Sequence, residues 1–204
     1  MMRFVLGFVA LLFVQTAFGQ LDYEENVIKH RQEKDAHFRD TAGKVLNAEE
    51  REHFPGLSYF EPDMDYIVGA RFKRSVGKNF EMPTTTARKP IYRRYGKLVF
   101  KLHGKKQRLF VYQPMVSLDS DSVKASYLFL PFRDATNGNA SYGGGRFLDL
   151  ELSNIGKYVT VDFNYCYNPY CAYSHRYSCP ITPKENTLDI GIEAGEKAYT
   201  GGNH

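Results

Sequence analysis

The most constraining feature of this sequence is the series of short apolar runs that begins after Gly56. The runs are rich in Val, Ile, Leu, Tyr and Phe, and clusters of Gly, Asn, Pro or Lys separate them, a pattern typical of β-strands joined by turns. Because strands joined by short turns pair antiparallel, we expect an antiparallel β-sandwich or a partly closed barrel of about seven or more strands. The predicted strands are residues 67–72, 98–102, 108–112, 127–132, 146–152, 158–163 and 188–192, and the clearest hairpin joins the second of these to the third.

Residues 21–54 have a different composition, dominated by Glu, Lys, Arg, Ala and His. Charges of opposite sign lie three or four residues apart, which predicts a solvated helix that lays one thin apolar stripe on the sheet. Its sparse apolar positions are Val27, Ile28, Ala36 and Phe38. Asn47 and Glu50 have the spacing of a capping box, so a second, short helix should begin there and end before Pro55.

The expected fold class is therefore mainly β (α+β), with one or two N-terminal helices. We expect one globular domain over residues 20–204, with a helical part at about 21–54 and a β part at about 58–196. A chain of this length can bury a sizeable core in a single domain.

Residues 1–19 have the three-part layout of a secretory signal. Arg3 precedes an apolar run of about 11 residues, which is too short for a membrane span, and Ala17 and Gly19 provide the small residues of a cleavage site. We expect cleavage before Gln20, no membrane span afterwards, and a periplasmic or secreted product. Removal of Arg3 takes the net charge from +4 to +3, a weak excess that does not predict nucleic-acid binding.

Residues 162–186 hold all three cysteines of the chain and five of its tyrosines. In an oxidising compartment Cys171 and Cys179 are candidates for a disulfide, but a reactive thiol pair stays open as an alternative. A metal site formed with His175 is a weaker alternative, because three ligands at this spacing match no usual zinc motif. Cys166 is then the odd thiol, and an odd cysteine is more often buried than reactive. No cofactor is predicted.

Polar residues next to tight turns offer a second kind of site. The glycines 143–145 can bring backbone N–H groups close to an anion beside Arg146, although the plainer interpretation pairs Arg146 with Asp134 or Asp149 in a strand connection. Asp149 and Glu151 fall on one face of a strand, where two carboxylates are more often a solvated face than an acid–base pair. Neither a serine-hydrolase elbow nor a zinc-protease helix motif is present in the sequence.

Several strings of the sequence occur together in a known family. They are Phe132-x-Asp134-x-Thr136-x-Gly138, Tyr142-Gly-x-Gly145-Arg146-x-Leu148-Asp149, Asp162-Phe-Asn164, Tyr167-Asn168-Pro169-x-Cys171, Cys179-Pro180-x-x-Pro183-x-Glu185-Asn186 and Ala194-Gly195-Glu196, preceded by Lys34-Asp35, Phe38 and Phe54-x-Gly56-Leu57. With these motifs the chain resembles the bacterial and archaeal domain of unknown function family 1684 over nearly the whole mature length. The resemblance implies no assigned activity. It includes Cys171 and Cys179 but not Cys166 or His175, which weakens the metal interpretation.

Three functional hypotheses follow, and the sequence does not fix a reaction or show whether the protein is an enzyme. The first is an exported β domain that binds or transforms a small polar molecule, such as an organic acid or a sugar. The second is a thiol or metal function at Cys171 and Cys179, and the third is a non-enzymatic envelope interaction protein whose polar strings only hold turns together. The candidate ligand-binding residues of the first hypothesis are Asp134, Tyr142, Arg146, Asp162, Asn164, Asn168, Glu185 and Asn186.

Overall fold

The computed structural model describes residues 3–40, 42, 45–115 and 126–201, with side chains from residue 19 onward. Its α-helices are α1 (Arg3–Arg39) and α2 (Ala48–Glu52). Its strands are β1 (Ile67–Arg74), β2 (Asn79–Glu81), β3 (Ile91–Leu102), β4 (Lys105–Pro114), β5 (Tyr127–Phe132), β6 (Arg146–Glu151) and β7 (Tyr158–Asp162). Three-residue 3-10 helices lie at Met64–Tyr66, Leu152–Asn154, Phe163–Tyr165, Tyr170–Ala172 and Lys184–Asn186.

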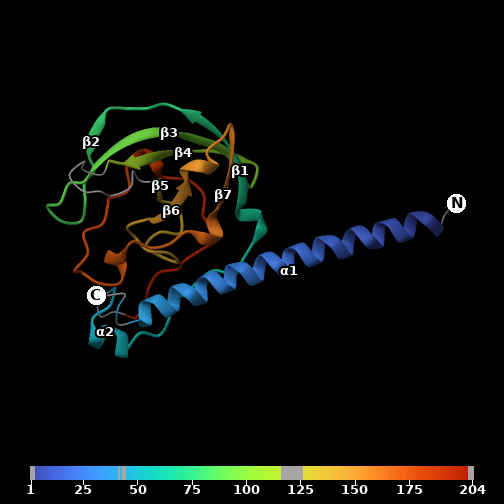
Figure 1. Cartoon of the computed structure of the whole chain (residues 1–204), viewed down its shortest axis with the longest axis horizontal. Helices are drawn as coiled ribbons and strands as arrows, with labels where there is room; N and C mark the ends of the chain where they lie inside the picture. The colour runs from blue at the N-terminus through green and yellow to red at the C-terminus, as the bar shows by residue number, and fades with distance from the viewer. Residues whose placement is uncertain (1–2, 41, 43–44, 116–125, 202–204) are drawn as a thin grey trace.

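The seven strands form one antiparallel sheet that curls into a half-barrel (Figure 1). The strand order is β6-β5-β4-β3-β1-β7, and β2 pairs with the N-terminal residues of β3. Sequence neighbours are neighbours in the sheet along most of this order, as expected for strands joined by short turns. The β3–β4 hairpin turns at His103 and Gly104, whose φ values of 47° and 77° suit a tight two-residue turn. The predicted partly closed antiparallel fold is confirmed.

The prediction of a strand at residues 188–192 is wrong, although the predicted alternation of buried apolar side chains is present. Leu188, Ile190, Ile192 and Ala194 are all buried in the main core, but the segment has no ladder of its own. It runs through the inside of the half-barrel, where its alternate side chains pack against the concave faces of the strands. Alternation with period two reports which side chains are buried, whether or not the backbone pairs. The seventh strand is β2, which the sequence did not reveal.

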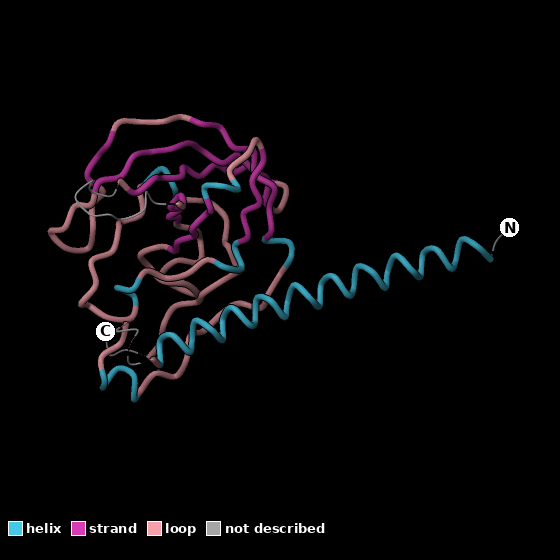
Figure 2. The backbone as a smooth tube through the Cα atoms, in the orientation of Figure 1, coloured by secondary structure: helices cyan, strands magenta, loops and turns pink. Residues whose placement is uncertain are grey.

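Helix α1 lies along the body with its C-terminal half and extends beyond it with its N-terminal half (Figures 1 and 2). Val27 and Phe38 are 0% and 1% exposed, whereas Ile28 is 46% exposed and lies outside the stripe. The stripe is completed by polar contacts: the Tyr23 hydroxyl donates to Asp162, and the ring of His30 packs edge-on against Tyr165. Spacing of three or four residues places these side chains on one face of the helix.

A second, smaller core joins the end of α1 to the cysteine-bearing segment. Phe38, Leu46 and Phe54 pack there with Ala172 and Tyr173. Asn47 and Glu50 form the predicted capping box at the start of α2. Among the residues that the structure describes, no helix is both long enough and apolar enough to cross a membrane.

Candidate functional site

One face of β5 and β6 is buried in the main core, and the other lines a cavity. Leu128, Leu130, Leu148 and Leu150 point into the main core. Because side chains alternate along a strand, Tyr127, Phe129, Phe147 and Asp149 stand on the opposite, outer face. These four residues line a cavity of about 440 Å³. The candidate site therefore lies outside the half-barrel, whose interior is filled by its own C-terminal segment.

Segments distant in sequence build the walls of this cavity. Residues 167–180 begin beside the free edge of β6, where the Phe147 N–H donates to the Tyr167 carbonyl at 2.8 Å and the Tyr167 N–H donates back at 2.9 Å. Helix α1 contributes His30 and Lys34. Six aromatic side chains share the lining: Tyr92, Tyr127, Phe129, Phe147, Tyr167 and Tyr170.

Four of these rings form a continuous wall. The ring centroids of Tyr92 and Phe129 are 5.6 Å apart, those of Phe129 and Phe147 are 4.7 Å apart, and those of Phe147 and Tyr167 are 6.0 Å apart. The last two pairs are edge-to-face, the arrangement that the charge distribution of aromatic rings favours. Each ring is therefore held by its neighbour, and the wall keeps its shape without a ligand.

The charge of Lys34 at the cavity wall is balanced within the protein. Its ammonium forms a salt bridge with Glu196 and lies 4.8 Å from the centre of the Tyr167 ring. Glu196 is 1% exposed and also accepts hydrogen bonds from the Asn168 N–H, at 2.8 Å, and from the Tyr173 hydroxyl. A buried carboxylate with this many donors is well satisfied, so the pair adds no net charge to the cavity.

Asp149 is the acidic group of the cavity. Its Oδ2 accepts a hydrogen bond of 2.6 Å from the Tyr167 hydroxyl. Although the side chain reaches solvent through the cavity, the surrounding walls remove part of its hydration, and this desolvation raises its pKa. Burial and the nearby Asp149 charge raise the pKa of Tyr167, so its hydroxyl stays protonated as a donor. On the part of the wall that α1 contributes, desolvation lowers the pKa of His30, which favours the neutral imidazole near pH 7.

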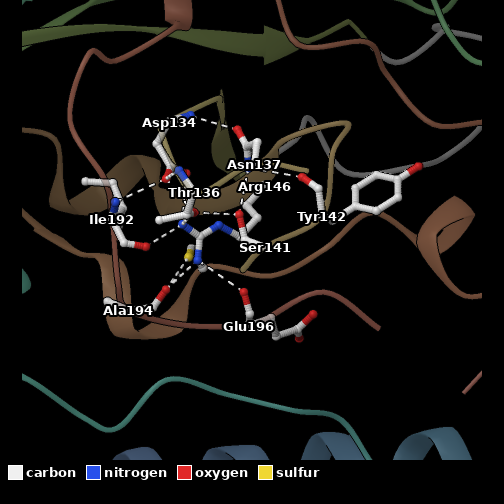
Figure 3. Close-up of polar contacts among 10 residues, drawn as sticks. Asp134, Thr136, Asn137, Ser141, Tyr142, Arg146, Ile192, Ala194 and Glu196 are labelled. Atoms are coloured by element: carbon white, nitrogen blue, oxygen red, sulfur yellow. Dashed lines mark hydrogen bonds and ion pairs between the residues drawn. The ribbon is translucent and has the colours of Figure 1, made fainter. Parts of the chain in front are cut away.

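Among the predicted ligand-binding residues, Asp134 and Arg146 form a buried ion pair (Figure 3). Both side chains are fully buried, and Arg146 Nη2 donates to Asp134 Oδ2 at 2.9 Å. Arg146 also donates to the carbonyls of Ile192, Ala194 and Glu196, so it fastens the C-terminal segment to β6. The plainer interpretation, pairing of Arg146 with Asp134, is the one that this geometry shows.

Three more of the predicted residues bond to backbone groups that they hold in place. Asn186 accepts from the Phe110 N–H and donates to the carbonyls of Phe110 and Pro131. Asn164 exchanges two hydrogen bonds with the backbone of Asp63. Asn168 donates to the Lys197 carbonyl and also lines the 440 Å³ cavity.

The remaining three predicted residues are dispersed. Asp162 accepts from Tyr23 and lines a separate cavity of about 260 Å³ between β6 and β7. Glu185 accepts from the Tyr112 hydroxyl at 3.1 Å. Tyr142 lines a third cavity, of about 100 Å³, beside Cys171. The structure thus brings the eight residues to several places rather than to one pocket.

The cysteines are thiols in the structure. All three are unbridged, so of the two candidate states for Cys171 and Cys179 the structure has the thiol pair and not the disulfide. The two residues are neighbours: the Cys171 N–H donates to Cys179 Sγ at 3.2 Å. His175 is exposed to solvent. Across the described parts of the chain, no three Cys, His, Asp or Glu side chains come together in a way that could hold a metal ion, so the arrangement does not support a Cys171–His175–Cys179 site.

Sequence reasoning missed most of the cavity. The sequence suggests Asp149 only as a partner of Glu151 or Arg146 and as part of a family string. It places His30 in a solvated helix, and His30 is indeed exposed while it also lines the cavity. Lys34 and Tyr167 were noticed only as members of family strings. One signal in the sequence could have indicated the cavity. The outer-face positions of β5 and β6 hold the aromatic residues Tyr127, Phe129 and Phe147 instead of polar ones, so both faces of these strands are largely apolar and the outer face is expected to be covered.

Together, fold and site define a class of small domain: a curled antiparallel sheet whose outer face carries a loop-covered aromatic cavity. The family model described as "Protein of unknown function (DUF1684)" matches residues 52–197. The chain belongs to this family, which confirms the resemblance seen in its motifs.

A solved relative supports the assignment. An uncharacterized protein from Haloarcula marismortui, with a solution NMR structure, is 35% identical, and the match covers 88% of this chain and 96% of that chain at a TM-score of 0.65. No curated protein matches the chain.

Proposed function

We propose that this protein binds a small, uncharged, polar ring molecule of the sugar class in the cavity on the outer face of β5 and β6. The observation that carries the proposal is the wall of packed aromatic rings beside Asp149. Aromatic faces suit the flat C–H surfaces of such a ring, while a carboxylate and hydroxyl groups accept and donate hydrogen bonds at its edge.

The charges around the cavity support a sugar rather than an organic acid, the two ligand classes that the sequence left open. Glu196 neutralises Lys34, and the lowered pKa of His30 keeps its imidazole neutral near pH 7. Asp149 is then the charge that a ligand meets. An anionic ligand would face this carboxylate without an unpaired cation on the described wall, whereas a neutral ring would not be repelled.

The proposal concerns binding rather than glycoside hydrolysis. Hydrolysis by the usual route needs two carboxyl groups that face each other across the scissile bond. Among the described residues that line this cavity, Asp149 is the only one with a carboxyl group, because Glu151 lines the neighbouring cavity.

Binding is testable by heteronuclear NMR titration of the labelled protein with glucose, galactose and myo-inositol, and with gluconate and benzoate as anionic probes. We expect at least one neutral ring to perturb the signals of Tyr127, Phe147 and Tyr167, and the anions to bind more weakly. Asp149→Asn should weaken binding about tenfold or more, because a hydrogen bond to a charged group is lost. Glu151→Gln is the matched control, on the same face of β6 but outside the cavity, and should bind as wild type does.

Two results would contradict this proposal. One is that none of the neutral rings perturbs the cavity at millimolar concentration, while the protein remains folded. The other is that gluconate or benzoate binds more tightly than every neutral ring.

We also propose that the protein is exported and that cleavage removes residues 1–19. The contacts described between α1 and the body begin at Tyr23, so a chain that starts at Gln20 keeps them all. N-terminal sequencing of the protein recovered from the extracytoplasmic fraction is expected to begin at Gln20. Recovery of an intact Met1 chain from the cytoplasm alone would refute export.

A further inference from the structure

We propose that Cys171 is a thiol–disulfide exchange site for small disulfides that carry a carboxylate, with Cys179 as its resolving thiol. The proposal does not require a ligand in the aromatic cavity, because the attacking thiol, Cys171, lines a different cavity.

The two thiols are placed for successive roles. Cys171 is partly exposed, at the 3-10 helix Tyr170–Ala172, whereas Cys179 is 7% exposed. The sulfur of Cys179 lies against the Cys171 backbone N–H at 3.2 Å, so little movement separates the thiol pair from a disulfide. A reagent thus meets Cys171 first, and Cys179 is already adjacent to resolve the product.

Each thiol faces its own cavity. Cys171 lines the 100 Å³ cavity together with Tyr142 and Arg133, and Cys179 lines the 440 Å³ aromatic cavity. The small cavity limits the substrate to a low-molecular-weight disulfide. Arg133 is the charged side chain among the described residues that line it, so a carboxylate on the substrate would be attracted there.

The chemistry balances without a cofactor. The Cys171 thiolate attacks one sulfur of the small disulfide, a mixed disulfide forms at Cys171, and the first small thiolate leaves. Cys179 then gives its proton to solvent and attacks Cys171 Sγ, which forms the Cys171–Cys179 disulfide and releases the second small thiolate. The protein pair loses two electrons, and the small disulfide gains them.

The environment of Cys171 supports its role as the attacking thiol. The hydrogen bond from the Cys179 thiol lowers the pKa of Cys171 to about 7, and the Tyr142 hydroxyl, 3.8 Å from the sulfur, adds to this effect. The same contact raises the pKa of Cys179. Burial raises the pKa of Cys166 to about 11, which makes Cys166 an internal control for an inert thiol.

Intact mass spectrometry of the reduced protein, incubated with 3,3′-dithiodipropionate, tests the assignment of roles. The wild-type chain and Cys166→Ser should end as a species that has lost two hydrogens. Cys179→Ser should accumulate a mixed disulfide at Cys171, and Cys171→Ser should react at least about tenfold more slowly. The pH profile is measured on the wild-type chain, because Cys179→Ser removes the thiol that lowers the pKa of Cys171. The wild-type rate of reaction should rise with pH and be half-maximal near pH 7.

Cystamine, of similar length but with an amine in place of each carboxylate, tests the role of Arg133. Dithiodipropionate should react faster than cystamine with the wild-type chain, and Arg133→Gln should remove the preference. The exchange proposal is overturned if Cys171→Ser forms a mixed disulfide as fast as Cys179→Ser. It is also overturned if the folded wild-type protein does not react while its three thiols titrate after unfolding.

Discussion

At the scale of single residues, the buried polar side chains of this protein chiefly form hydrogen bonds that hold backbone segments in place. Asn186 joins its own segment to β4 and β5, Asn164 holds the loop before β1, and Arg146 holds the C-terminal segment. Polar groups removed from water must be paired, and side chains that pair with backbone carbonyls fix loops that have no ladder. The same residue types would also serve a ligand, so the sequence alone left both interpretations open.

Arg146→Met should destabilise the fold by about 3–5 kcal/mol, because Asp134 would be left as a buried charge without its partner. The change is measured as the free energy of unfolding in urea. Arg71→Met, on the exposed side of β1, is the control and should change that free energy by no more than about 0.5 kcal/mol. If Arg146→Met does not fold, Asp134→Asn tests the same pair with a smaller loss. Stability like that of wild type in either variant would contradict the fastening role.

At the scale of elements, the sequence predicts that α1 buries a narrow apolar stripe, but it does not predict every residue in that stripe. The sequence predicted a solvated helix with a thin stripe, and the contacts of Val27 and Phe38 with the body agree. It did not separate Val27 from Ile28, since both are aliphatic neighbours in a sparse pattern. Two polar contacts with the body determine which face of α1 is buried. Tyr23 donates to Asp162 and Lys34 pairs with Glu196, and together these contacts fix the rotation of the helix about its axis.

Val27 and Ile28 therefore form a matched pair of tests. Val27→Ala should lower the free energy of unfolding by about 2 kcal/mol, because it removes buried methyl groups and leaves a small cavity. Ile28→Ala, at a position 46% exposed, should lower it by no more than about 0.5 kcal/mol. Equal effects in urea denaturation would mean that α1 does not dock through this face.

At the scale of the whole molecule, the C-terminal segment determines where a cavity can form. A curled sheet could enclose a ligand in its interior, but Leu188, Ile190 and Ile192 fill that space with the protein's own side chains. The cavity forms instead on the outer face of β5 and β6, between α1 and residues 167–180. These segments meet in the folded protein because the second core packs the end of α1 against the cysteine-bearing segment.

The sequence by itself determined the antiparallel β class, six of the seven strands, the short helix α2 and the C-terminal part of α1. It also determined the family. These features follow from local periodicity, turn residues and ordered motifs. It also determined that residues 162–186 are dense in reactive groups. Only the tertiary structure decided that residues 188–192 pack in the core without forming a strand. It also decided that Arg146 pairs with Asp134, and that Lys34, Asp149 and Tyr167 line one cavity. The physical reason is that these outcomes depend on which distant segments meet, and side-chain alternation or residue type is the same whether a group faces a neighbour, a ligand or water.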